Sequence, residues 1–193
     1  MLSQKEFKKH QQFNTEENWK EPFRKLKALT QDTKLIWFQF RILHNILTTN
    51  RSVSKYDNNQ TDRCTFCRTE SETVIHLLWT CPKVKVFWTQ LKNIINTRCH
   101  LTYTLTFDQT SITHGILTGE QKNPTLELII IIAKHYIYYS KVCDTQPHVN
   151  KFIQIIHNRY KIEGALTNNK QNKEKFSQKW EKYLNIFKDL SVE

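Results

Sequence analysis

The sequence predicts a mostly helical domain with an inserted zinc knuckle and at most a short strand or hairpin. Three observations lead to this fold class. Apolar residues recur at helical spacing over several segments, the alternation typical of a strand occurs once, and cysteines and a histidine are spaced C-x2-C-x8-H-x4-C. With 38% hydrophobic residues, the 193-residue chain can bury a core. We expect residues 1–193 to form a single domain, with residues 60–85 as the knuckle module inside it.

Two helices are predicted before the knuckle. The first carries its apolar residues on one face, at Trp19, Phe23, Leu26 and Leu29. Asp32 is suited to cap a second helix that begins at about Thr33. That helix runs through KLIWFQFRILHNIL, in which almost no polar face is left. We therefore expect it to be buried on most sides and to be the central element.

The segments after the knuckle are also predicted to be mainly helical. A helix over residues 84–95 carries an apolar face of Val84, Phe87, Trp88, Leu91 and Ile95. Residues 101–107, LTYTLTF, alternate and favour a short extended segment. Helices over residues 124–142 and 147–160 each open with proline, which the first turn tolerates. A final amphipathic helix carries Phe176, Trp180, Tyr183, Leu184 and Phe187, and the polar residues 1–15 and 164–175 are expected to be mobile.

The composition argues against an enzyme. Three glycines cannot build a glycine-rich phosphate loop, and the chain has no H-E-x-x-H motif, serine elbow or adjacent pair of aspartates. The acids Glu70, Glu72 and Asp108 stand in polar contexts typical of solvated side chains. We expect neither catalysis nor a small-molecule substrate. The net charge of +11 favours a polyanionic partner instead.

The compartment is expected to be intracellular, in the cytoplasm and/or the nucleus. The chain opens on polar residues without the apolar region of a secretory signal. Its longest apolar run, Leu128 to Ala133, is far shorter than the roughly 20 residues that span a membrane, so no membrane association is expected. In a reducing compartment, five cysteines favour metal binding or free thiols over disulfides.

The most informative segment is RCTFCRTESETVIHLLWTCPKVKVFW. A C-x2-C turn can direct two thiolates to one point, and a short helix can supply the other two ligands. The predicted ligands of one structural Zn²⁺ are Cys64, Cys67, His76 and Cys81. The alternative is a group of buried thiols and a surface histidine. Cys99 and Cys143 lack partners at ligand spacing and are expected to be core thiols.

Basic and aromatic residues beside these ligands are candidates for contact with nucleic acid. The basic candidates are Arg63, Arg68, Lys83 and Lys85, which would pair with phosphates. Phe66, on the turn, is the candidate for stacking on an unpaired base, whereas Trp79 is expected in the core. The alternative is that the charges form an ordinary solvated surface.

The segments that contain these residues resemble segments of a known protein family. WFQFRILHNILTTNRSVSK followed by CTFCRTESETVIHLLWTCPKVKVFW is similar to the zinc-binding segment that follows the reverse transcriptase domain of LINE-type, non-LTR retrotransposon proteins. The downstream ILTG and AKHYIYYSK stretches are similar to the extreme C-terminal region of such proteins. The resemblance implies zinc ligation by the four predicted ligands and a non-catalytic C-terminal piece of a larger polyprotein. It also implies contact with single-stranded RNA or target DNA during target-primed reverse transcription, beside a reverse transcriptase domain.

Two alternatives to nucleic-acid binding remain open. The chain could be a helical scaffold that docks on the polymerase, with purely structural zinc, because residues 35–47 carry a wide apolar face that includes Trp37, Phe38 and Phe40. It could also be a retrotransposon relic without function.

Overall fold

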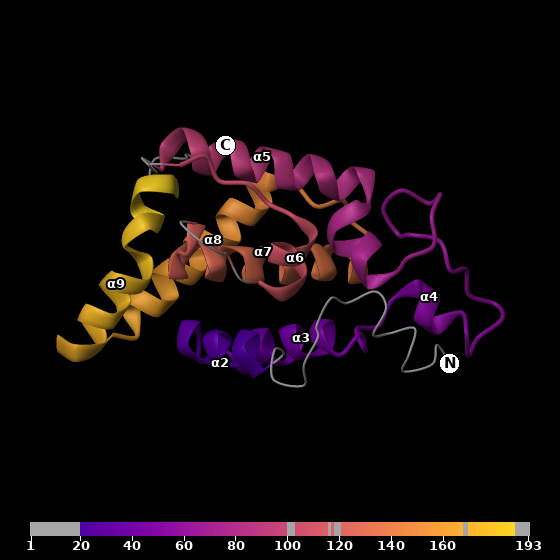
Figure 1. Ribbon diagram of the computed structural model, residues 1–193, viewed down its shortest axis with the longest axis horizontal. Helices are drawn as coiled ribbons and strands as arrows, with labels where there is room; N and C mark the ends of the chain where they lie inside the picture. Colours follow the sequence, from indigo (N-terminus) through magenta and orange to yellow (C-terminus); the bar gives the residue numbers. More distant parts are fainter. Residues whose placement is uncertain (1–19, 100–102, 116, 118–120, 168–169, 188–193) are drawn as a thin grey trace.

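The computed structural model describes residues 20–99, 103–115, 117, 121–167 and 170–187 (Figure 1). Within these residues the chain is mostly helical, as predicted, and its only β-pairing is an isolated bridge in the knuckle. The predicted mobile segment 1–15 lies outside the described residues. The elements in chain order are α2 (Lys20–Leu29), α3 (Thr33–Leu43), α4 (Asn50–Val53), the π-helix η1 (His76–Thr80), α5 (Pro82–Arg98), α6 (Gln109–His114), α7 (Pro124–Val142), α8 (Val149–Ala165) and α9 (Lys170–Phe187).

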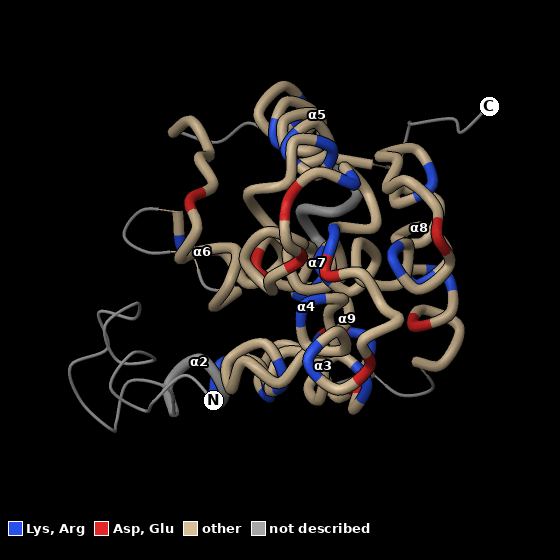
Figure 2. Tube along the Cα trace, turned by 90° about the vertical axis from the view of Figure 1, so that its right-hand side faces the viewer, with Lys and Arg blue, Asp and Glu red and all other residues tan. Residues whose placement is uncertain are grey.

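Helix α7 is the central element. Every residue from Thr125 to Lys134 is buried, and the helix contacts α2, α3, α8, α9 and η1. In Figures 1 and 2, α5 lies on one side of α7 and α3 lies on the other. The start of α7 is fixed by Asn123, whose side chain accepts from the N–H groups of Thr125 and Leu126, and by Pro124 in the first turn. Among the described residues, no helix has both the length and the apolar character that a membrane crossing requires.

Helix α3 corrects the expectation of a central helix buried on most sides. It begins where predicted, with the Asp32 side chain accepting from the N–H of Lys34. Its buried residues, however, form one stripe of Leu35, Phe38, Gln39 and Ile42. Trp37 is 64% exposed on the helix, and Ile46, just beyond its end, is 59% exposed. An apolar composition alone could not show which face would meet α7, because both faces are apolar.

The predicted apolar face of α5 is confirmed, since all five of its residues are buried. The extended segment that follows is corrected in part. Leu101 and Thr102 lie outside the described residues, and Tyr103 to Phe107 form no strand. The backbone of Leu105 instead pairs with a side chain of α5, because Asn96 accepts from its N–H at 2.8 Å and donates to its carbonyl at 3.1 Å. The amide of Asn96 thus takes the place of a partner strand.

Helices α8 and α9 pack against each other around residues 164–175, a segment that the sequence predicts to be mobile. Its described part is largely helical, because α8 continues to Ala165 and α9 begins at Lys170. The rings of Tyr160 and Phe176 lie 5.2 Å apart, and the buried Trp180 donates to Glu163 Oε2 at 2.9 Å. The polar composition did not predict these helical turns, and the mobility of the segment stays a prediction. Helix α8 begins at Val149, two residues after the predicted Pro147.

Candidate metal centre and basic surface

The knuckle, residues 60–85, opens with a short antiparallel pairing that carries the first two predicted ligands. The N–H of Cys64 donates to the carbonyl of Glu70 at 2.8 Å, and the N–H of Glu72 donates to that of Asp62 at 2.7 Å. The turn between the cysteines closes through the N–H of Arg68, which donates to the carbonyl of Cys64 at 2.9 Å. Arg68 has a φ of 60°, the left-handed conformation common in tight turns. This turn brings Cys64 and Cys67 to the same point.

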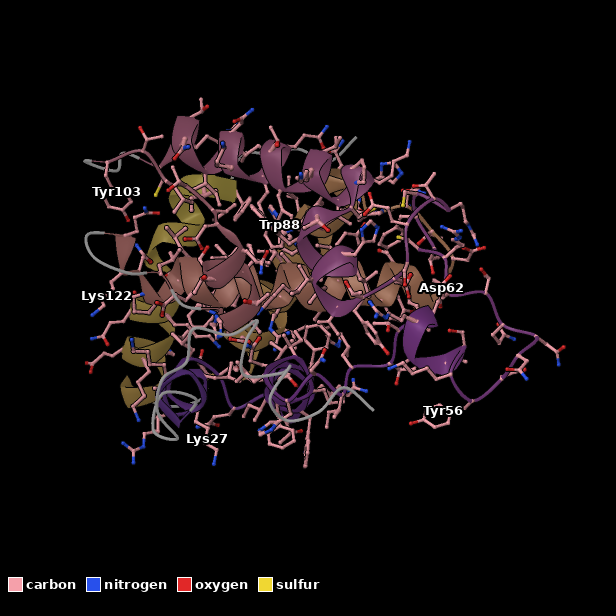
Figure 3. All side chains as sticks on the ribbon, turned by 45° about the vertical axis from the view of Figure 1, so that its right-hand side comes forward. Lys27, Tyr56, Asp62, Trp88, Tyr103 and Lys122 are labelled. Atoms are coloured by element: carbon pink, nitrogen blue, oxygen red, sulfur yellow. The ribbon has the colours of Figure 1, made fainter. Side chains whose placement is uncertain are left out.

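The π-helix η1 supplies the other two ligands. The N–H of Cys81 donates to the carbonyl of His76 at 2.9 Å, which is the i to i+5 bond of a π-turn. Cys81 also caps α5, and Pro82 occupies the first turn of that helix. The wide turn therefore brings both of its end residues to the metal centre. Figure 3 shows sulfur atoms gathered where the loop that carries Asp62 approaches α5.

The four predicted ligands lie in a geometry that fits a metal ion. Their donor atoms all lie within 4.8 Å of one another, and Cys67 alone of the four is partly exposed. The sulfurs of Cys64 and Cys81 are 3.8 Å apart, and Cys67 Sγ is 3.4 Å from His76 Nε2. Tetrahedral bonds of about 2.3 Å to sulfur and about 2.0 Å to nitrogen place such pairs about 3.8 and 3.5 Å apart. These residues could therefore hold one ion.

Hydrogen bonds and burial shift the pKa values of the three cysteines in different directions. The contact with Cys81, followed by burial, raises the pKa of Cys64 well above its ordinary value. The same contact lowers the pKa of Cys81 against the effect of burial, and the N–H groups of Val84 and Lys83 at the start of α5 lower it further. Burial opposes ionisation of Cys67, but the N–H of Glu70 and the hydroxyl of Thr69 bring its pKa below the ordinary value. Close packing of the cysteines favours retention of thiol protons, and a bound cation can take the place of those protons.

A carboxylate and a hydroxyl orient His76. Its Nδ1 lies 3.2 Å from Glu70 Oε2 and 3.3 Å from Thr80 Oγ1, whereas Nε2 faces Cys67. A histidine that ligates a metal commonly donates its other ring N–H to such a partner. Nε2 is therefore the nitrogen available to an ion. Glu70 is exposed, as expected, but it also has this specific contact.

Glu72 corrects the expectation of a solvated side chain. It is fully buried, and its two oxygens accept from the N–H of Asn50 at 2.9 Å and of Thr65 at 2.8 Å. The ammonium of Lys141 on α7 lies 3.6 Å away. One carboxylate thus connects the knuckle to α4 and α7. The polar neighbours of Glu72 in the sequence concealed this role, which depends on contacts with distant segments.

The structure places the predicted nucleic-acid residues in two kinds of environment, because Phe66 is buried and the four basic residues are exposed. Phe66 is only 4% exposed and cannot serve as a surface stacking residue, because the turn directs its ring into the core. Arg63 donates to the carbonyl of Thr69, and Arg68 pairs with Asp144 at 2.7 Å, so both arginines brace the knuckle while remaining exposed. Lys83 and Lys85 are exposed and form no ion pair with an acid of the described chain.

A groove beside the knuckle brings the predicted Lys85 together with Lys92, which was not among the candidates. Trp79, expected in the core, is only half-buried and lines a groove with Lys85 and Lys92 of α5. No Asp or Glu occurs between Glu72 and Asp108, although this stretch contains four Lys or Arg. Figure 2 shows blue segments and no red along α5. A long basic stretch without acids was the sequence signal that could have indicated this surface.

The two remaining cysteines differ in burial. Cys99 is buried at the end of α5, as expected for a core thiol. Cys143 is exposed, so the prediction of a core thiol is wrong there, because α7 ends at Val142 and the next residues turn into solvent.

Comparison of the chain with protein-family models, with curated proteins and with solved structures gives no match.

Proposed function

We propose that this chain is a non-catalytic module that holds one structural Zn²⁺ and binds single-stranded RNA or target DNA. In this proposal it acts inside the cell as the C-terminal segment of a LINE-type reverse transcriptase, which its sequence resembles. The single observation that carries the proposal is the grouping of Cys64, Cys67, His76 and Cys81 within 4.8 Å. This centre lies next to a basic helix that contains no acid.

The donor set supports zinc as the metal and a structural role for it. Three sulfurs and one imidazole nitrogen are typical ligands of structural zinc sites, whereas magnesium and calcium prefer oxygen. Four protein ligands fill a tetrahedral shell and leave no open position for a reacting water. The metal would therefore contribute to folding of the knuckle, with the Glu70 carboxylate fixing the orientation of His76.

The charge distribution supports the nucleic-acid part of the proposal. The chain carries a net charge of +11, and Lys83 and Lys85 next to the metal centre form no ion pair within the described chain. Free ammonium groups can pair with phosphates and release counterions. The reactive chemistry of the family would reside in the neighbouring polymerase domain, which is the proposed protein partner.

Metal analysis of the purified chain tests the first part. We expect one zinc per chain in the wild type and none in Cys81→Ser, because a ligand is lost. Cys99→Ser is the matched control, since Cys99 is also buried but lies outside the four-residue cluster. Equal zinc content in the two variants would overturn the assignment of the ligands.

A titration with single-stranded oligonucleotides tests the second part. Fluorescence anisotropy with an RNA and a DNA of equal length should give affinities that fall steeply with salt, because phosphate contacts release counterions. The comparison of the two oligonucleotides determines which nucleic acid is preferred. Absence of binding to both at low salt would overturn the proposal.

One observation favours a second candidate function, docking on the polymerase domain with purely structural zinc. The exposed Trp37 and Ile46 present large apolar side chains at the outer face and end of α3. If docking is the function, Trp37→Ala should weaken association with a reverse transcriptase domain in a pull-down of the two purified proteins, and zinc content should not change. Unchanged association would argue against this candidate.

A further inference from the structure

A small groove lies between η1 and the first turns of α5. Its volume is about 190 Å³, and it is lined by Trp79, Lys85, Trp88, Thr89, Lys92 and Phe107. A cavity of about 150 Å³ is large enough for a benzene ring. The groove therefore has room for one flat ring.

The aromatic wall of the groove is held rigidly. The buried Trp88, labelled in Figure 3, donates from Nε1 to the carbonyl of Leu78 at 2.8 Å, and its ring meets Phe107 edge-on at 5.4 Å. Trp79, which is only half-buried, completes the aromatic lining. Its position in the sequence is between the ligands His76 and Cys81. An ion in the knuckle would consequently fix the turn that presents this indole.

The rim of the groove is positively charged. Lys85, Thr89 and Lys92 are spaced i, i+4 and i+7 along one face of α5, so the two lysines lie two turns apart, about 10 Å along the axis. Neither lysine forms an ion pair with an acid of the described residues. Helix α5 contains no Asp or Glu, so no acid of its own opposes an anion at this rim.

We propose that the groove receives one unpaired base of a single-stranded nucleic acid, stacked on Trp79, with flanking phosphates on Lys85 and Lys92. This inference rests on the proposed function and assigns its binding site. An aromatic lining with cations at the rim is complementary to a base with phosphates on either side. A duplex keeps its bases paired and stacked, so it cannot fill the groove without unpairing. The site differs in part from the predicted one. Trp79 takes the place of Phe66, the predicted Lys85 is joined by Lys92, and the other predicted residues do not line the groove.

Two variants test the two parts of the site against a labelled oligouridine RNA and a DNA of the same length. Trp79→Ala should weaken binding by between about 5- and 150-fold with little change in the salt slope, because it removes stacking. The double variant Lys85→Gln, Lys92→Gln should lower the slope of log K against log salt by about 1.4, because two phosphate contacts are lost. Trp79→Phe should recover part of the affinity. The matched control is Lys151→Gln, since Lys151 is an exposed lysine of α8 that does not line the groove.

Crosslinking of the wild-type chain gives a result that does not depend on how variants fold. An oligouridine with one 5-iodouridine should crosslink to Trp79, located by mass spectrometry of the digested adduct, and an unlabelled duplex should not compete. If the wild type binds neither oligonucleotide at low salt, the proposed function fails and the groove with it. If the wild type binds but Trp79→Ala binds equally well and the crosslink lies elsewhere, the groove is overturned while the proposed function stands.

Discussion

Lys134 is a buried cation whose environment makes stability depend on pH. It lies in the buried part of α7 and donates from Nζ to Gln39 Oε1 on α3. Gln39 in turn donates to the carbonyls of Thr113 and His114 in α6, at 3.0 and 3.1 Å. No described carboxylate lies within ion-pair distance of the ammonium. Burial lowers the pKa of Lys134 from 10.5 to about 7.

This lowered pKa sets both the sign and the size of the effect. Between pH 7 and 10.5 the unfolded chain holds a proton on this lysine that the folded chain has released, so stability rises with pH in that window. At 1.36 kcal/mol per pKa unit, the full difference is about 5 kcal/mol. About 2 kcal/mol of it is recovered between pH 7 and 9. Below pH 7 Lys134 is protonated in both the folded and the unfolded chain, so its contribution to stability no longer depends on pH.

The variant Lys134→Met removes this titration. At pH 7 we expect it to be more stable than the wild type by about 1–3 kcal/mol, because the charge penalty outweighs the unsatisfied Gln39 oxygen. Urea unfolding at pH 7 and pH 9 should show that this advantage shrinks by about 2 kcal/mol. The control is Lys151→Met, an exposed lysine of α8. A difference between wild type and Lys134→Met that does not change with pH would refute the reasoning.

Three further substitutions have expected outcomes. Cys64→Ser should abolish zinc binding and make residues 60–85 sensitive to limited proteolysis, whereas retained zinc with an unchanged digest would contradict this. Gly115→Ala should lower the free energy of unfolding by about 1–2 kcal/mol in urea titrations, because Gly115 has a φ of 70° and the added Cβ would lie 3.1 Å from Ile131. An unchanged free energy of unfolding would contradict this backbone conformation. Glu72→Gln should cost about 1–3 kcal/mol by thermal unfolding because the ion pair with Lys141 is lost, and an unchanged Tm would argue against the anchoring role.

Local patterns in the sequence predicted much of the fold. The N-cap at Asp32, the five buried positions of α5 and the residue range of α7 follow from spacing and capping chemistry, which act over a few residues. The grouping of the four metal ligands followed from their spacing for a similar reason. A turn and a single π-helix connect them, so no distant part of the chain has to be known.

What the sequence could not predict depends on contacts between distant segments. Which of two apolar helices would be central was decided by packing: α7 is buried along most of its length, whereas α3 exposes Trp37. The burial of Glu72 requires Lys141, and the burial of Phe66 places its carbonyl where Gln146 donates at 3.1 Å. These partners are more than 60 residues away along the chain, and no periodic pattern relates them.

The π-helix η1 connects the metal centre, the apolar core and the groove. Its end residues reach the metal centre, because the i to i+5 bond brings His76 and Cys81 together. Leu77 and Leu78 between them are fully buried in the core, and Trp79 lines the groove. The core leucines hold one side of the turn without any ion, whereas the direction of Trp79 depends on the ligands on either side of it. Loss of zinc should therefore weaken nucleic-acid binding at concentrations of chelator that leave the helical content of the chain largely unchanged.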